Sequence, residues 1–591
     1  MKYKYTTLVA TLMLAGTSFA ETINVPGDHA TIQDAIYASS NGDVNNIAPG
    51  TYYESDLSTS LLTQLVVAEL EVKSKPLNGL AGIGQPKKHV HGKNCVSAKD
   101  RENMSLGLRE YIRKFGPLSQ ASFTEDNRKY PIFPVGAREW EDLIMVNYVD
   151  MNPDEGSHEA WDCGSYSYDG HKGIDGLIYT FEHQFVGVPI IAPFDGVVYL
   201  THDGEPDQNT VWDPDTASNY VAIDHGLGRY IWYLHMKQGS VSVEVGEEVK
   251  AGQQIGMVAS SGYSDWPHLH FESWIPHEIL EDEWVNYEPY AGDCNLQESG
   301  WINQIPIPVG ATCKEFGVTT TDLNDFFADE EYMWMPPLEG YIPIENDGVW
   351  MWTIATDIGP FSNYQMRFYD PNGNLQHDSG TNWLNFSWTS YKFLVTWFYW
   401  DFSELAEIPG TWTVDVLVNG DPYINFPMTL VEEGDPTPNR TPEPIEAIMT
   451  PYFPTVDDLL SCQILQPGPV NDLDWDLVRY EYTWSVGGNV LRQVETAGLA
   501  DHLPRLDACP GAIVTCTVVP TDGQSNGEPF TVSKRIEGSS DGDINCDGNI
   551  DVNDLLKLIA DWGSCEQCAG DLNQSGEVNI ADLLTLLANW S

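Results

Sequence analysis

The sequence predicts a multidomain, mainly β protein that ends in a small α-helical tail. Three observations support this prediction. The chain has 591 residues, several times the length of an ordinary domain. Between about residues 136 and 536, strand-length apolar runs alternate with glycine-rich turns. After residue 541, a unit with helical apolar spacing occurs twice.

The first 20 residues have the pattern of a secretory signal peptide. They read MKYKYTTLVATLMLAGTSFA, with a basic start, a short apolar centre and the small-x-small site Ser18-Phe19-Ala20. No later segment carries the apolar run that a membrane-spanning helix requires. We therefore expect a secreted, extracellular protein without a transmembrane segment.

Charge and cysteine content agree with export. The formal net charge is −58, and such an acidic surface repels nucleic acid, so we expect no nucleic-acid partner. The ten cysteines suit an oxidising compartment. Cys294 with Cys313 and Cys462 with Cys516 are plausible disulfides, although sequence alone does not fix the pairing.

The N-terminal region, residues 21–135, has two parts. Residues 23–54 resemble the opening turn of right-handed parallel β-helix proteins, but no repeated coils follow, so we expect no β-helix domain. Residues 56–135 hold 12 of the chain's 29 Lys and Arg residues. A basic segment can dock on an acidic domain. We therefore predict that residues 21 to about 130 form a pro-segment; a poorly ordered linker is the alternative.

Three β-rich regions follow. Residues 136–300 contain runs such as GVPIIAPFDGVVYLTHDG and predict an antiparallel β domain. Residues 330–432 contain similar runs and the hairpin signal Asp-Pro-Asn-Gly, which predicts an accessory β-sandwich. A proline-rich linker leads to residues 445–536, which resemble immunoglobulin-like repeats of bacterial exoproteins.

The stretch DWPHLHFES, residues 265–273, carries two histidines separated by one leucine. Side chains alternate along a strand, so His268 and His270 would face a cleft while Leu269 and Phe271 enter the core. A lone pair of this kind is more often a surface feature than a metal site. Partners elsewhere in the chain are needed to support a metal site.

Two upstream motifs supply these partners. YDGHKGIDG places His171 and Asp175 four residues apart, and YIWYLHMK contains His235. Zinc binds imidazole nitrogen and carboxylate oxygen, and a catalytic zinc keeps one position for water. His171, Asp175 and one histidine of the later pair would provide three ligands.

Taken in order, H-x-x-x-D, Y-x-H-M and H-L-H-F-E resemble the lysostaphin-type zinc endopeptidases over about residues 135–280. The resemblance implies an antiparallel β fold of the duplicated hybrid motif type and one catalytic zinc. It implies His171, Asp175 and His270 as the zinc ligands and His235 and His268 as the catalytic histidines.

The resemblance also implies a substrate class. Family members cut glycine-rich or D-amino-acid-containing bonds in peptidoglycan, and some attack elastin. We expect a peptide or peptidoglycan substrate, with Trp266 at the rim of the cleft and Tyr168 lining the site. Two alternatives remain: a catalytically inactive cell-wall-binding or activator module, and an adhesion or matrix protein in a dockerin–cohesin assembly.

The tail, residues 541–591, contains two units that begin 28 residues apart, at Asp543 and Asp571. Each has a D-x-N-x-[DS]-G loop, in which oxygen ligands and a glycine recur at calcium-loop positions. The pair resembles a dockerin module, which implies two structural calcium ions and a cohesin-like partner. We also expect Leu555, Leu556 and Leu558 to pack against Leu583, Leu584 and Leu586. The predicted calcium ligands are Asp543, Asn545, Asp547, Asn549, Asp551 and Asp554 in loop one and Asp571, Asn573, Ser575, Glu577, Asn579 and Asp582 in loop two.

Overall fold

The computed structural model of the protein describes residues 79–84, 95–117 and 129–590 apart from short gaps, and the backbone of 22–25, 44–47, 50–53 and 70–73. The predicted signal peptide therefore lies outside the described residues, as does the centre of calcium loop one. The gaps are residues 212–215, 278–279, 281–282, 330, 347, 360, 385–392, 402–407, 457, 466–467, 505–510, 538–541, 545–549, 565–567 and 574.

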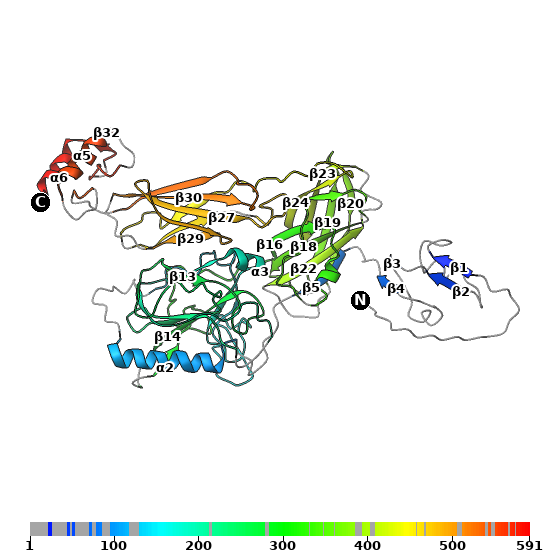
Figure 1. The fold of residues 1–591 in the computed structure, drawn as a ribbon, viewed down its shortest axis with the longest axis horizontal. Coiled ribbons are helices and arrows are strands. Elements are labelled where there is room, and N and C mark those ends of the chain that lie inside the picture. The colour runs from blue at the N-terminus through cyan, green and yellow to red at the C-terminus, as the bar shows by residue number, and fades with distance from the viewer. Residues whose placement is uncertain are drawn as a thin grey trace.

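The predicted mainly β architecture is confirmed. Three β units follow one another along the chain, and a small helical tail lies at the C-terminal end (Figure 1). In the N-terminal region, β1 (Thr22–Val25) pairs in parallel with β2 (Val44–Ile47), and β3 (Gly50–Tyr53) with β4 (Leu70–Lys73). Each pair is a separate two-stranded sheet.

The central domain is built on an eight-stranded sheet. Its strands run in the order β12-β9-β10-β11-β14-β7-β6, with β15 paired to β14. A smaller sheet of β8 (Pro189–Ile191) and β13 (Gln254–Met257) and the short helix α3 (Phe181–Val186) complete the domain. The strands of the large sheet are β6 (Ile144–Asn147), β7 (Ile174–Leu177), β9 (Gly196–His202), β10 (Tyr220–Asp224), β11 (Tyr230–Leu234), β12 (Glu248–Val249), β14 (His268–Pro276) and β15 (Trp284–Asn286).

The large sheet has two different faces because side chains alternate along each strand. One face, which includes Leu269 and Phe271, enters the main hydrophobic core, and this core extends back to Tyr130. The opposite face carries His268 and His270. We call this second face the site face.

The helix α2 (Ala98–Phe115) covers part of the site face, beside β14 (Figure 1). It begins after Ser97, whose side chain accepts a hydrogen bond from the Asp100 backbone nitrogen at 3.0 Å. Its buried residues Met104 and Leu108 pack in one cluster with aromatic and aliphatic side chains of β9, β10 and β11. Part of the predicted pro-segment therefore belongs to the central domain's packing.

An accessory sandwich follows. One sheet has the order β16-β18-β22-β5 and the other β17-β24-β23-β19-β20, with β21 on β19. The first sheet starts before the predicted range 330–432 and includes a strand from the N-terminal region. The elements are β5 (Gly79–Gly84), β16 (Thr312–Thr319), α4 (Leu323–Phe326), β17 (Tyr341–Pro343), β18 (Gly348–Thr356), β19 (Asn363–Tyr369), β20 (Leu375–Asp378), β21 (Asn382–Trp383), β22 (Leu394–Asp401), β23 (Gly410–Val418) and β24 (Asp421–Val431).

The strands β18 and β22 are buried on both faces. Met351 and Phe398 pack inside the sandwich, whereas Trp352 and Trp397 join the core of the central domain. Continuous apolar runs such as FLVTWFYW are typical of strands that are covered on both sides. The accessory sandwich is therefore fixed against the central domain by a shared core.

A second sandwich contains sheets in the orders β25-β26-β29 and β28-β27-β30-β31, which enclose a separate core. Its strands are β25 (Ala447–Thr450), β26 (Leu460–Ile464), β27 (Arg479–Val486), β28 (Asn489–Thr496), β29 (Ala500–Leu503), β30 (Ile513–Thr521) and β31 (Phe530–Arg535).

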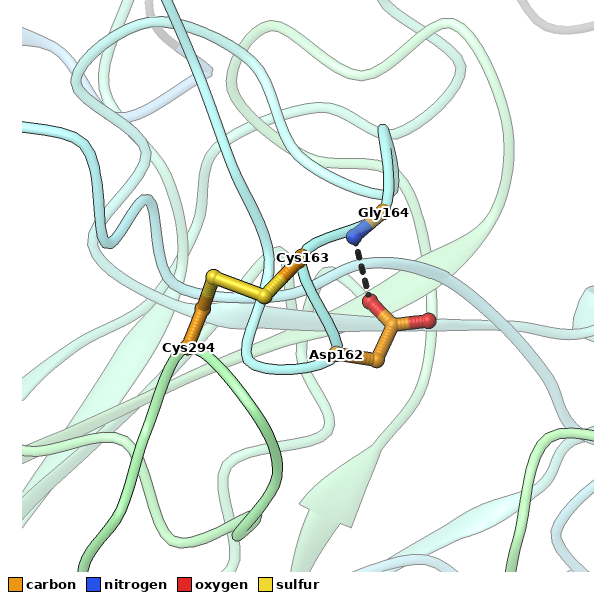
Figure 2. Close-up of a disulfide and its surroundings, with 4 residues drawn as sticks. All are labelled: Asp162, Cys163, Gly164 and Cys294. Atoms are coloured by element: carbon orange, nitrogen blue, oxygen red, sulfur yellow. Dashed lines mark hydrogen bonds between the residues drawn. A yellow bond between two sulfur atoms is a disulfide. The ribbon is translucent and has the colours of Figure 1, made fainter.

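The cysteine pairing differs from the expectation. Cys163 forms a disulfide with Cys294, as Figure 2 shows, so the expected Cys294–Cys313 bond is wrong. Cys163 and Cys294 are 131 residues apart in sequence, which no local spacing could indicate. Cys313 is a buried thiol, and Cys462 and Cys516 are also buried thiols, in the core of the second sandwich.

The tail consists of α5 (Val552–Ala560) and α6 (Ile580–Ala588), with a two-stranded sheet of β32 (Gly563–Ser564) and β33 (Glu577–Val578). Leu558 and Leu586 are buried in its small core, and Leu555 and Leu583 pack against them. The expectation was wrong for Leu556 and Leu584, which are both 61% exposed. Among the described residues, no helix is long and apolar enough to cross a membrane.

Candidate metal centre

The sheet register brings the three predicted zinc ligands together. His270 on β14 pairs with Asp175 on β7, so both side chains leave the sheet on the site face. His171 lies on the loop that enters β7, and its Nε2 approaches Asp175 Oδ2 to 3.2 Å. All three residues are buried.

The donor atoms fit a tetrahedral zinc ion. In a tetrahedral site with ordinary zinc–nitrogen bonds, two nitrogen ligands lie about 3.3 Å apart. His171 Nε2 and His270 Nδ1 are 3.3 Å apart, which matches this spacing, and His171 Nε2 is 3.2 Å from Asp175 Oδ2. Asp175 Oδ1 lies closer to His270 Nδ1, at the 2.8 Å of a hydrogen bond. The residues present therefore fit the metal that this donor set implies.

Neighbouring groups fix which nitrogen of each histidine faces the metal position. His270 Nε2 donates to Glu272 Oε1 at 2.8 Å, which leaves Nδ1 for the metal. His171 Nδ1 donates to the Tyr148 carbonyl at 2.8 Å, which leaves Nε2. Glu272 is itself fully buried. Burial raises its pKa, but the charges of Arg101 and His270 lower the pKa by more, to about 2.

A fourth donor, which sequence reasoning missed, lies in the same cluster. The Cys95 sulfur is 3.4 Å from His270 Nδ1 and accepts a hydrogen bond from the Tyr168 hydroxyl at 3.0 Å. Ligand atoms of Cys95, His171, Asp175 and His270 all lie within 4.8 Å of one another. Tyr168 lines the site as expected, with its ring 4.4 Å from that of His171.

The two predicted catalytic histidines lie beside this cluster. His235 follows β11 with a left-handed φ of 61°, and its Nδ1 donates to the Ser261 carbonyl at 2.6 Å. His268 Nδ1 donates to the Trp266 carbonyl at 2.7 Å. Their rings are 4.6 Å apart, and within the described residues neither buried Nε2 atom has a hydrogen-bond partner. The His268 Nε2 also lies 3.7 Å from Asp175 Oδ1, and although burial opposes the charged form, Asp175 and Cys95 raise the pKa of His268 above its ordinary value.

The buried site brings acidic and basic side chains into contact, and these contacts shift their pKa values. Burial disfavours the charged forms, but Asp175 raises the pKa of His171 to about 9, and the histidines hold the pKa of Asp175 well below its usual value. Burial also opposes ionisation of Cys95, yet His270 and its neighbours hold the pKa of that thiol well below the usual value. Burial lowers the pKa of His235, which favours its neutral form.

Trp266 does not lie at the rim of a cleft, contrary to expectation. Its side chain is buried, its Nε1 donates to the Tyr179 carbonyl at 2.9 Å, and its ring contacts Phe393 from the accessory sandwich. The docking of that sandwich therefore covers the tryptophan.

The comparisons with known proteins locate one recognised domain. Residues 170–283 match peptidase family M23. The chain contains a peptidase M23 domain. This match covers His171, Asp175, His235, His268 and His270.

Relatives support a peptide hydrolase whose family implies a catalytic metal. An uncharacterized metalloprotease of Buchnera aphidicola is 31% identical over 110 residues, 19% of this chain and 24% of that protein. Lysostaphin of Staphylococcus staphylolyticus is 50% identical over 107 residues, 17% of this chain and 20% of that protein. The chain thus spans about a quarter or less of either relative. The solved catalytic domain of lysostaphin from Staphylococcus simulans is 27% identical, with a TM-score of 0.15 and coverage of 20% of this chain and 77% of that one.

Several of the predicted calcium ligands lie among the described residues of the tail. Asp554 and Asp582 are buried, and each accepts backbone hydrogen bonds at the start of its helix. In loop two, the buried Asp571 carboxylate accepts from the backbone nitrogens of Ser575 and Gly576 at 3.0 and 2.8 Å. Asp543, Asp551, Asn573, Glu577 and Asn579 are also described, whereas Asn545, Asp547 and Asn549 lie outside the described residues.

Proposed function

We propose that this protein is a secreted, zinc-dependent endopeptidase that cleaves peptide bonds in peptidoglycan cross-links or in glycine-rich structural proteins. The observation that supports the proposal most directly is the joint placement of three zinc donors and two histidine Nε2 atoms on one sheet face. Names among the relatives, such as peptidoglycan DD-endopeptidase and glycyl-glycine endopeptidase, support the substrate class.

The residues divide the chemistry between them. His171, Asp175 and His270 would hold the zinc, which supplies a Lewis acid and a water acidic enough to ionise near neutral pH. The Nε2 atoms of His235 and His268 would accept a proton, return it to the leaving amine and stabilise the oxyanion. Carbonyl acceptors hold both imidazole rings by Nδ1, so these Nε2 atoms are fixed in position.

The test compares single variants on purified peptidoglycan and on elastin. New amino groups are counted before and after limited proteolysis of the full chain. His270→Ala should lose both bound zinc and activity, because it removes a ligand. His268→Ala should keep zinc and lose on the order of a hundredfold in turnover. The exposed His158, changed to Ala, is the matched control. Zinc loss of the same size in both site variants would show that the pair is assigned wrongly, and no release of amines from either substrate would contradict the function.

We further propose that the tail is a dockerin-like module that binds two calcium ions and a cohesin-like partner. Exposed apolar side chains support a partner surface because they recur at the 28-residue spacing of the two units. The equivalent pairs are Val552 with Ile580, Leu556 with Leu584, Ile559 with Leu587 and Trp562 with Trp590, and each of these side chains is at least 41% exposed.

A further inference from the structure

We propose that Cys95 is the fourth ligand of the zinc ion, so that the chain as folded holds its own hydrolytic site closed. The inference rests on the proposed function. It also goes beyond it, because Cys95 lies outside the matched residues 170–283.

The position of the sulfur supports ligation. In a tetrahedral zinc site, a thiolate sulfur lies about 3.6 Å from each nitrogen ligand, because the zinc–sulfur bond is longer than the zinc–nitrogen bond. The observed distance from Cys95 Sγ to His270 Nδ1 is 3.4 Å. A zinc ion held by these residues would then have the Cys95 sulfur as its fourth ligand, in the position that a catalytic zinc keeps for water.

The closed state follows from burial. Cys95 is 2% exposed, His235 is fully buried and His268 is 5% exposed. A peptide substrate must reach these groups, and the Cys95 sulfur lies in the same donor cluster as His270, so the substrate would have to displace it.

Specific contacts hold the segment on the site face. The buried Asp100 carboxylate accepts from the Ser218 backbone nitrogen at 3.0 Å and from its hydroxyl at 3.2 Å. Further along, Met104 and Leu108 are buried, and an added Cβ at Gly107 would meet Leu200 of β9 at 3.0 Å. The helix therefore crosses from β14 to β9 over the sheet face that carries the ligands.

A second contact reaches the metal centre itself. Arg101 Nη2 is 2.9 Å from Glu272 Oε1, and Arg101 Nη1 donates to Glu272 Oε2 at 3.2 Å. Glu272 is the carboxylate that orients His270. One segment thus supplies the fourth donor and also binds the group that positions another ligand.

Cobalt substitution tests the assignment without using activity. The full chain is stripped of metal and reloaded with Co²⁺, because a thiolate ligand gives a sulfur-to-cobalt charge-transfer band in the near ultraviolet. We expect this band in the native chain and in Cys313→Ser, the matched control at another buried thiol. We expect Cys95→Ser to bind cobalt without the band. A band that persists in Cys95→Ser, or that is absent from the native cobalt protein, would overturn the assignment.

Alkylation of the native chain gives an independent measurement if Cys95→Ser does not fold. Iodoacetamide labelling of Cys95, read by peptide mass spectrometry, should be at least about tenfold slower with saturating zinc than after chelation. Equal rates would contradict ligation.

The outcomes separate the two proposals. Peptide hydrolysis without a thiolate–cobalt band would reject Cys95 as a ligand and leave the function standing. A thiolate–cobalt band together with no hydrolysis by Cys95→Ser would reject the function and leave the ligand standing. Failure of the native chain to bind cobalt or zinc would overturn both.

Discussion

Gly173 should be essential to the metal centre because of the space it leaves. The residue lies between His171 and Asp175 in the loop that enters β7. A Cβ atom added there would lie 2.5 Å from both Cε1 and Nε2 of His270, whereas ordinary contacts begin at 3.4 Å. In Gly173→Ala the ring of His270 must therefore move by about 0.9 Å, or the loop must move instead.

The ring has little freedom to move. Its Nδ1 lies 2.8 Å from Asp175 Oδ1 and its Nε2 lies 2.8 Å from Glu272 Oε1, so a shift of this size breaks at least one contact. Zinc sites tolerate errors of only about 0.2 Å in ligand distance. We expect zinc affinity to fall at least about 10- to 100-fold, the range seen when groups that orient ligands are lost.

The assay is competition for zinc against a chromophoric chelator, with circular dichroism to show that the variant folds. Gly359→Ala is the matched control, because an added Cβ there meets nothing closer than 3.8 Å. A folded Gly173→Ala protein with native zinc affinity would refute the reasoning.

Three further predictions concern other parts of the chain. Glu272→Gln should weaken zinc binding about 10- to 100-fold in the same assay, and native affinity would contradict its orienting role. Burial raises the pKa of Glu315 to about 8, so the folded protein holds a proton that the unfolded chain releases, and stability falls as pH rises from about 4.5 to about 8. Glu315→Gln removes this penalty, which differs between pH 5 and pH 8 by about 3.5 kcal/mol in the free energy of unfolding, so the melting temperature should rise more at pH 8 than at pH 5. Equal gains at the two pH values would contradict the ionisation argument. Asp543→Asn should remove the tighter of two calcium steps in calorimetry of the full chain and Asp571→Asn the weaker, because loop one offers more carboxylates; two equal native steps would reject this asymmetry.

Sequence periodicity was sufficient to predict the part of the site that lies on a single strand. Alternation along DWPHLHFES placed the two histidines on one face and the apolar pair in the core, which is the arrangement in β14. The same reasoning was incomplete in the tail. Leu556 is one residue from Leu555 and two from Leu558, so on a helix it points away from the core they share.

Long-range contacts explain the remaining differences. Cys95 meets His270 across 175 residues, and no spacing rule connects a cysteine in a basic N-terminal region with a histidine on a distant strand. Trp266 is buried by Phe393 of another domain. For the accessory sandwich a signal was present, because the continuous apolar runs of β18 and β22 indicate strands covered on both faces.

Cys95 and the zinc site belong to one chain, so the strength of the closed state depends on the effective concentration of the thiolate at the metal. A thiolate held in the same chain competes with water and substrate as if present at about millimolar concentration or more. Apolar contacts of α2 and the pair of Arg101 with Glu272 add to this advantage. Glu272 also orients His270, so zinc binding and docking of the Cys95 segment are linked. Zinc binding and segment docking must therefore strengthen each other by the same factor. Zinc should therefore stabilise the closed segment, and removal of zinc should loosen it even while every peptide bond stays intact.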